Sequence, residues 1–539
     1  MPSPPSSARR VALAVALVVA VAGLAALGPA LAQSPKRGGV LNLMQREDPP
    51  QGFNVHETST ISVVWPASPC FSNLVYFDPA QRLESADTVI PELAEKWSWQ
   101  DGYRSLVFFL RKGVKWHDGH PFTARDVKFT FDMVREAPES PGKLRVNPRK
   151  DWYGNVEAIE VADAFTVVFR LKRPQPGFLM LLATGQSPVF PAHVPVAEQR
   201  TRCVGTGPFK LKEWRRNEFI DYVRNPDYFV PGRPYLDGLR YTVISERGTR
   251  AAALQAGRLD AANPGDVTRN IANQLKAAVP GMVVQEVGSG VVDNILMNHG
   301  RPPFNDARLR RAVHVALDRP AFIKAVAEGG ALIGGAMAPP PVGSWGITQG
   351  DLVAIHGKPE EGKGRARKIL AELGYSPANP LKIDAVTRTL ASYVDLSSWV
   401  ISELKQVGME VSLRQLDAVQ WYSVTTRKEF TLAIAVSGIG LDEPDAVLVE
   451  NFTCHSVRNY IGYCNEQIGA LIDKQSQEID PRKRRALVAD ILKRLEQEAA
   501  RPVVAWRMDY FTHWPYVKGL TAHHSIYNYA RMQDVWLDK

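Results

Sequence analysis

The sequence lacks the short motifs that carry much of enzymatic chemistry. It contains no Gly-x-Ser-x-Gly elbow, no His-Glu-x-x-His, no Walker loop and no paired Cys-x-x-Cys motifs. After Leu27 it has no apolar run as long as a membrane span, and beyond the N-terminal segment it has no repeat or low-complexity tract. These absences argue against an enzyme built on such a motif and against a membrane bundle. We expect no catalytic residue, no cofactor and no metal.

Cysteine is scarce, with four residues in a chain of 539. Cys454 and Cys464 lie in the short segment CHSVRNYIGYC, and we predict that they form a local disulfide. A metal site that includes His455 is the alternative, but it lacks a fourth ligand and the usual zinc spacing. The sequence does not decide whether Cys70 and Cys203 pair.

The N-terminus has the order of a secretory signal peptide. Arg9-Arg10 precedes an apolar run from Val11 to Leu27, and Ala30-Leu31-Ala32 follows. We therefore predict a signal peptide over residues 1–32, with cleavage after Ala32, and a periplasmic mature protein. An uncleaved membrane anchor is the alternative, and the export route stays open.

The bulk composition is that of a globular protein, with 45% hydrophobic and 22% charged residues. The length allows two or three domains. The net charge of +9 is spread among acidic residues along most of the chain, so we expect no nucleic-acid partner.

Strand and helix patterns alternate along the whole chain, which predicts α/β lobes. The apolar and turn patterns predict strands at residues 39–43, 105–110, 166–171, 239–244, 381–386, 410–416, 431–436 and 502–506. They predict helices at residues 65–76, 249–256, 365–373, 396–407 and 482–499, and a pair of helices after Asp306.

The segment from Leu110 to Val134, LRKGVKWHDGHPFTARDVKFTFDMV, is the most informative part of the chain. Asp118-Gly119 suits a turn that needs positive φ, and His117 and Asp118 are interpreted as residues that shape this turn. Thr123 stands three residues before Asp126, an approximate capping box that predicts a helix start.

This segment resembles a block of the family 5 extracellular solute-binding proteins, the peptide, dipeptide and nickel receptors of ABC importers. Other blocks resemble the family in the same order: PELAEKWSW, VGTGPFKLKEW, NPDYF, PFNDARLRRAVHVALDR and RARKILAELGY. The resemblance covers nearly all of the chain after the signal peptide. It implies a periplasmic receptor that captures a peptide or amino-acid-derived solute by hinge closure. Its partners would be that solute and an inner-membrane ABC permease with its ATPase, and the receptor would be a monomer.

The resemblance also implies a two-lobed periplasmic-binding-protein fold with a hinge and an extra α/β subdomain in lobe I. Lobe I would comprise residues 33–80, 201–298 and 506–539, the subdomain residues 81–200, and lobe II residues 299–505. The hinge crossings would then lie near Met297-Asn298 and Trp506-Arg507.

Four residues are predicted to bind ligand. Arg388 follows a predicted strand close to where dipeptide-receptor relatives place a carboxylate-binding arginine, and an arginine fork suits a carboxylate. Asp442 resembles the acidic position that meets a peptide's ammonium group. His56 and Thr58 lie where relatives line the lobe I wall. Each has a structural alternative: a solvated loop arginine for Arg388, a turn before Pro444 for Asp442, and helix capping for His56 or Thr58.

One departure from the peptide-binding relatives leaves the ligand open. Ile439 stands where those relatives often carry tryptophan, so a nickel-type metal chelate and a short oligosaccharide remain alternatives. Trp421 and Tyr422 are interpreted as core residues, and His523 and His524 as surface histidines.

Overall fold

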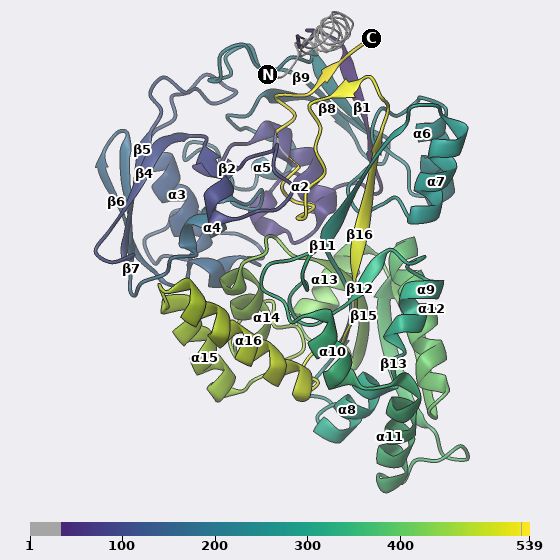
Figure 1. Ribbon diagram of the computed structural model, residues 1–539. Coiled ribbons are helices and arrows are strands. Elements are labelled where there is room, and N and C mark those ends of the chain that lie inside the picture. Colours follow the sequence, from purple (N-terminus) through teal and green to yellow (C-terminus); the bar gives the residue numbers. More distant parts are fainter. Residues whose placement is uncertain (1–33, 530) are drawn as a thin grey trace, which may run out of the picture.

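The protein has two lobes joined by a pair of long strands, which confirms the predicted α/β fold (Figure 1). The computed structural model describes residues 34–529 and 531–539, so the predicted signal peptide lies outside the described residues. Within the described residues no helix is long and apolar enough to cross a membrane.

Lobe I is built around a four-stranded sheet in the order β1-β10-β9-β8. β1 and β10 are parallel, and the other two pairings are antiparallel. The elements of this lobe are β1 (Val40–Gln45), η1 (Val55–Glu57), α2 (Ile61–Ala67), η2 (Ser68–Cys70), α5 (Gln199–Arg202), β8 (Phe209–Arg215), β9 (Phe219–Arg224), β10 (Gly238–Val243), α6 (Arg247–Gln255), α7 (Arg269–Ala278), β17 (Val517–Lys518) and β18 (Trp536–Leu537).

A subdomain with its own antiparallel sheet, in the order β4-β5-β7-β6, packs on this lobe. Its core is continuous with that of lobe I, since Phe108, Phe131 and Leu41 belong to one cluster of buried side chains. Its elements are β2 (Val75–Phe77), η3 (Ala86–Thr88), β3 (Val89–Pro91), β4 (Ala94–Gln100), β5 (Ser105–Leu110), α3 (Ala124–Val134), η4 (Lys150–Tyr153), β6 (Val156–Asp163), β7 (Thr166–Leu171) and α4 (Phe178–Ala183).

Lobe II is built around a six-stranded sheet in the order β12-β16-β11-β15-β13-β14. β13 is parallel to both of its neighbours, and the remaining pairings are antiparallel. Its strands are β11 (Val283–Met297), β12 (Ala331–Ile333), β13 (Leu381–Arg388), β14 (Met409–Leu416), β15 (Leu432–Gly438) and β16 (Val503–His513).

Helices cover both faces of this sheet (Figure 1). Side chains such as Leu396 and Leu492 form two further core clusters between helices and strands. The helices are α8 (Ala307–Ala316), α9 (Arg319–Ala325), α10 (Gln349–His356), α11 (Pro359–Glu372), α12 (Ala391–Lys405), α13 (Ala418–Thr426), η5 (Asp445–Val449), α14 (Glu450–Phe452), α15 (Glu466–Gln477) and α16 (Pro481–Gln497).

The long strands β11 and β16 connect the lobes. Their pairing is regular from Val283 to Gly288 and shifts in register before it resumes at Val292. On the lobe I side, single bridges from Ala261 to Leu43 and to His513 tie the two sheets together. The register shift is a local weakness in the strand pairing at the junction. It lies several residues before Met297, where the sequence predicted the first hinge crossing.

Most predicted elements exist, but the helix predicted at residues 65–76 is wrong. Helix α2 begins at Ile61, because the Thr60 hydroxyl accepts a hydrogen bond from the backbone N–H of Ser62. It ends at Ala67, and Pro69 opens a short 3₁₀ turn. The last predicted turn is instead the short strand β2.

The prediction that His523 and His524 lie on the surface is also wrong, since each is 1% exposed. The C-terminal segment packs between the subdomain and β11. His523 Nε2 lies 3.0 Å from the Pro79 carbonyl oxygen, and His524 Nδ1 lies 3.0 Å from that of Gly288.

Candidate functional site

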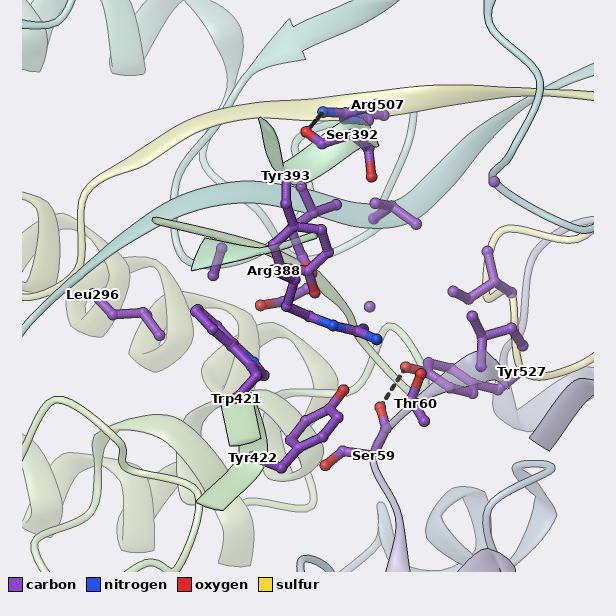
Figure 2. A pocket seen from close by; sticks show the side chains of 18 of the residues that line it. Ser59, Thr60, Leu296, Arg388, Ser392, Tyr393, Trp421, Tyr422, Arg507 and Tyr527 are labelled. Carbon is purple, nitrogen blue, oxygen red and sulfur yellow. Dashed lines mark hydrogen bonds between the residues drawn. The ribbon is translucent and has the colours of Figure 1, made fainter. Parts of the chain in front are cut away.

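A cleft lies between the lobes, beside the two connecting strands. Its wall combines the loop before α2, the ends of β13 and β15, the start of α13 and part of β16. Figure 2 shows Arg388, Trp421 and Tyr422 on one side of this space, with Ser59, Thr60 and Tyr527 facing them. The Tyr527 hydroxyl donates a 3.0 Å hydrogen bond to the Ser59 carbonyl oxygen, which holds the lobe I wall in place.

Arg388 lies in this cleft, as predicted from the sequence. It is the last residue of β13, and its side chain projects into the cavity (Figure 2). Its Nη2 lies 2.8 Å from both carboxylate oxygens of Glu47, which follows β1 in lobe I. The Tyr393 and Tyr422 rings flank the guanidinium, with centroids 5.4 and 5.8 Å from its central carbon. The pair of Arg388 and Glu47 therefore joins the two lobes across the cleft.

Asp442 lies outside the cleft wall and is buried beneath it. Its Oδ2 accepts a 2.5 Å hydrogen bond from the backbone N–H of Ser344, and its Oδ1 has no hydrogen-bond partner among the described residues. Burial raises the pKa of Asp442. The structure does not bring this carboxyl together with Arg388 on one ligand surface.

His56 and Thr58 are both buried, but they lie in different places. The His56 ring packs against Phe190, and its Nε2 lies 2.8 Å from the Pro188 carbonyl oxygen. Burial lowers the pKa of His56 to about 4, so the ring is neutral at pH 7. Thr58 lines a groove that adjoins the cleft, and its hydroxyl oxygen accepts a 3.1 Å hydrogen bond from the Thr60 backbone N–H. In this loop it is Ser59 and Thr60 that reach the cleft.

The loop that contains the predicted disulfide supplies two cleft residues that sequence reasoning missed. Cys454 and Cys464 are bonded, which confirms that prediction. Arg458 and Tyr460 lie inside the closed loop and line the cleft. Arg458 donates a 2.9 Å hydrogen bond to Glu450. The loop sequence holds an arginine and a tyrosine between the bonded cysteines, which was the available signal.

Three more arginines of the cleft wall were missed: Arg46, Arg501 and Arg507. Arg46 follows β1, Arg501 lies just before β16, and Arg507 belongs to β16. Nothing in their local sequence distinguishes them from solvated arginines, since only the packing of the lobes brings them together.

The aromatic residues of α13 serve two purposes. Trp421 is 3% exposed and belongs to the lobe II core, as predicted, while one edge of it also lines the cleft. Tyr422 stands at the cavity edge beside Arg388 (Figure 2).

Two groups of side chains among the described residues have the spacing of metal ligands, and both lie away from the cleft. His314, His356 and Glu496 are buried in lobe II, where Arg319 donates to the His314 ring at 3.4 Å. This guanidinium disfavours a cation there, and a 3.0 Å contact from His356 Nε2 to Glu496 already occupies the carboxylate. Asp118, His120 and His193 form the second group, on the surface of the subdomain.

Comparison with known proteins places this architecture in one family. The sequence model of the bacterial extracellular solute-binding proteins, family 5 (Middle), matches residues 88–459. The chain belongs to this family. The expected resemblance is thereby confirmed, and the predicted capping box at Thr123 and Asp126 is present in α3 of this family 5 protein.

Individual relatives agree with this assignment. The chain is 26% identical over 482 residues to a probable di/tripeptide-binding protein 5 of Pseudomonas aeruginosa, covering 83% of this chain and 86% of the relative. It is 27% identical over 481 residues to the oligopeptide-binding protein AppA of Bacillus subtilis, covering 84% and 83%. The periplasmic binding protein DppA of Helicobacter pylori, solved with the peptide STSA, superimposes with a TM-score of 0.82 at 23% identity, covering 94% and 99%. This structural likeness shows the fold.

Proposed function

We propose that this family 5 protein is the periplasmic receptor of an ABC importer and captures a peptide or amino-acid-derived small solute by hinge closure. The observation that carries the proposal is the cleft between the two lobes, which β11 and β16 connect. Arg388 lines this cleft, and an arginine side chain can bind a carboxylate group through two hydrogen bonds. The names of the relatives, which refer to di-, tri- and oligopeptides, support this ligand class.

Closure follows from contacts between the lobes. The pair of Arg388 and Glu47 joins them inside the cleft, and Arg247 pairs with Asp395 at 3.0 Å near the connecting strands. A solute that binds between the walls favours the closed arrangement, because only there can it contact both. The closed shape is then recognised by a membrane permease with its ATPase, which are the proposed partners.

The proposal assigns Arg388 to a ligand carboxylate and Thr58 to the adjoining groove. For Asp442 and His56 it assigns structural roles, because both are buried away from the wall and are held by backbone groups. We keep the domain limits inferred from the sequence as part of the proposal, with lobe II over residues 299–505 and the subdomain over residues 81–200.

We also propose that the mature protein begins after Ala32, acts as a monomer in the periplasm and has no catalytic activity. Incubation with a panel of chromogenic esters and amides tests the last point. Turnover that is lost on heat denaturation of the protein would overturn the receptor proposal.

The ligand class is tested by thermal denaturation of the mature protein with dipeptides, glutathione, a nickel–histidine chelate and maltotriose. A specific ligand raises the melting temperature in proportion to the logarithm of its concentration over its Kd. We expect a rise with peptides or related acids. A rise only with the chelate or only with the sugar would replace the peptide class by the corresponding alternative.

A further inference from the structure

Arginine dominates the charged side chains of the cleft. Five arginines line it, namely Arg46, Arg388, Arg458, Arg501 and Arg507, and among the described residues the carboxylate that meets them in the cleft is that of Glu47, which is paired with Arg388. The remaining polar groups of the wall are hydroxyls and one amide, from residues such as Ser59, Tyr422 and Asn451. A ligand ammonium group would therefore meet only a carboxylate that Arg388 already engages.

Carboxylates behind the wall neutralise the arginines only in part. Arg388 pairs with Glu47, and Arg507 pairs with Asp293 through hydrogen bonds of 2.8 to 3.0 Å. Arg458 pairs with Glu450, but that carboxylate is shared with the buried Arg149. The guanidinium groups of Arg458 and Arg149 therefore share one carboxylate.

Arg501 has only neutral acceptors. Its Nε and Nη2 donate to the Asn294 Oδ1 at 3.1 and 2.9 Å, and its Nη1 donates to the Asn451 Oδ1 at 2.5 Å. It forms no ion pair with any described residue. Burial and the nearby positive charge of Arg458 lower the pKa of Arg501 to about 10, which leaves it charged at pH 7. An anion beside Arg501 would offset both the desolvation and the repulsion.

Arg46 is the second arginine without a direct acidic partner. Its Nε lies 3.4 Å from the Ser62 hydroxyl oxygen, and no carboxylate of the described residues lies within ion-pair distance of its guanidinium. Together with Arg388 it lowers the pKa of Glu47, so these two arginines act on the same carboxylate. The incompletely balanced positive charge thus lies in two pairs of arginines, Arg46 with Arg388 around Glu47, and Arg501 with Arg458 beside Glu450.

We infer that the solute is an acid of net negative charge that carries at least two carboxylate groups, one for each arginine pair. The inference deepens the proposed receptor function and rests on it. Glu47 already occupies Arg388 in the manner of a carboxylate ligand, and a solute carboxylate would bind there by replacing it or by using Arg46 beside it. Arg501 and Arg458 would bind the other carboxylate through paired hydrogen bonds, because the nearby carboxylates balance their positive charge only in part.

The test compares two dipeptides that differ by one charge, alanyl-glutamate and alanyl-glutamine, and adds N-succinyl-alanine, which has two carboxylates and no ammonium group. Binding to the mature protein is measured by isothermal titration calorimetry at pH 7.5. Because one charge-assisted arginine contact contributes roughly a tenfold difference in affinity, alanyl-glutamate should bind about tenfold or more tightly than alanyl-glutamine. N-succinyl-alanine should bind despite its missing ammonium group.

Variants test whether the arginines of the cleft cause the preference for the acidic dipeptide. Arg501→Gln and Arg46→Gln should each reduce the affinity for alanyl-glutamate about tenfold while changing that for alanyl-glutamine little. Arg482→Gln removes the same charge from an exposed position on α16 and should leave both affinities unchanged. Arg501→Lys keeps the charge and serves where the glutamine variant unfolds; it should retain the preference for the acidic dipeptide.

The outcomes separate the inference from the proposal beneath it. Equal or tighter binding of alanyl-glutamine by the unmodified protein would overturn the acid preference and leave the receptor function intact. Equal losses for both dipeptides in the two glutamine variants would also overturn it. If none of the three compounds and no other peptide bound, the proposed peptide class would fail, and the inference with it.

Discussion

The segment from Leu110 to Val134 and the cleft are built in opposite ways. The segment obtains its turn and its helix from residues a few positions apart: Gly119 has φ +92°, and Thr123 and Asp126 form the capping box of α3. The cleft obtains its five arginines from segments that span residues 46 to 507. No residue of the segment lines the cleft.

We propose that this difference separates a segment that stabilises the fold from a cleft that selects the ligand. Changes in the segment should alter stability and leave affinity intact, whereas changes in the cleft should do the reverse. The disulfide loop should affect both stability and affinity, because a local covalent bond closes the loop that contains two cleft residues. Four experiments test this division, from the largest expected effect to the smallest.

Phe131→Ala should lower the free energy of unfolding by about 3–5 kcal/mol, because it removes a buried ring from a packed core. Phe131 is fully buried, and its ring centroid lies 5.3 Å from that of Tyr153 and 5.4 Å from that of Phe169. Chemical denaturation measures the loss, and Phe129→Ala, at a half-buried position of the same helix, should cost less. A drop in the ligand affinity of the folded variant would contradict the division.

Replacing both Cys454 and Cys464 with serine should cost about 2–3 kcal/mol, because the unfolded chain gains the freedom of the open loop. The same change should weaken ligand binding, since Arg458 and Tyr460 lie within the loop. Denaturation and calorimetry measure the two effects. Unchanged affinity would show that the hydrogen bonds of Asn459 to Thr453 and Tyr463 are enough to hold the loop.

Arg388→Ala should reduce the affinity for a carboxylate-bearing ligand about 10- to 100-fold, corresponding to the loss of about 1.5–3 kcal/mol from charge-assisted hydrogen bonds. Calorimetry with alanyl-glutamate measures this loss, and Arg482→Ala is the matched control on the surface. If the affinity stayed the same, Arg388 would not be the carboxylate reader.

The pair of Glu47 and Arg388 should make closure sensitive to acid. Burial by itself would raise the pKa of Glu47, but Arg388 and Arg46 lower it below its usual value of 4.5. The pair is therefore intact above pH 4.5 and is lost as the pH falls through the lowered pKa.

Small-angle scattering should accordingly show a modest increase in the radius of gyration as the pH falls through the lowered pKa of Glu47, while the protein stays folded. Glu47→Gln should remove the pH dependence, and Glu213→Gln, which changes an exposed glutamate, should retain it. A pH response that persisted in Glu47→Gln would assign the closure to other contacts.

Much of the fold follows from the sequence because its signals are local. The strands β5 and β7 have the predicted limits, and α8 begins directly after Asp306, where a helix was predicted. The failures have local and tertiary causes. The Thr60 hydroxyl starts α2 earlier than predicted, and residues 75–77 form β2 because they pair with β3. The histidines at 523 and 524 are polar but buried, and their rings contact the carbonyl oxygens of Pro79 and Gly288. Pairing and burial of this kind depend on segments far away in the chain.

The site divides in the same way. Arg388 could be placed in the cleft because its position after a predicted strand resembles that of the carboxylate-binding arginine of dipeptide receptors, and the disulfide followed from the spacing of two cysteines. Asp442 has the predicted place in the chain, but its side chain is buried against Ser344. The sequence by itself determined the family, the α/β fold class and one arginine of the cleft. Only the tertiary structure decided the charge of the wall, because that charge is a sum over five side chains whose carboxylate partners are set by packing.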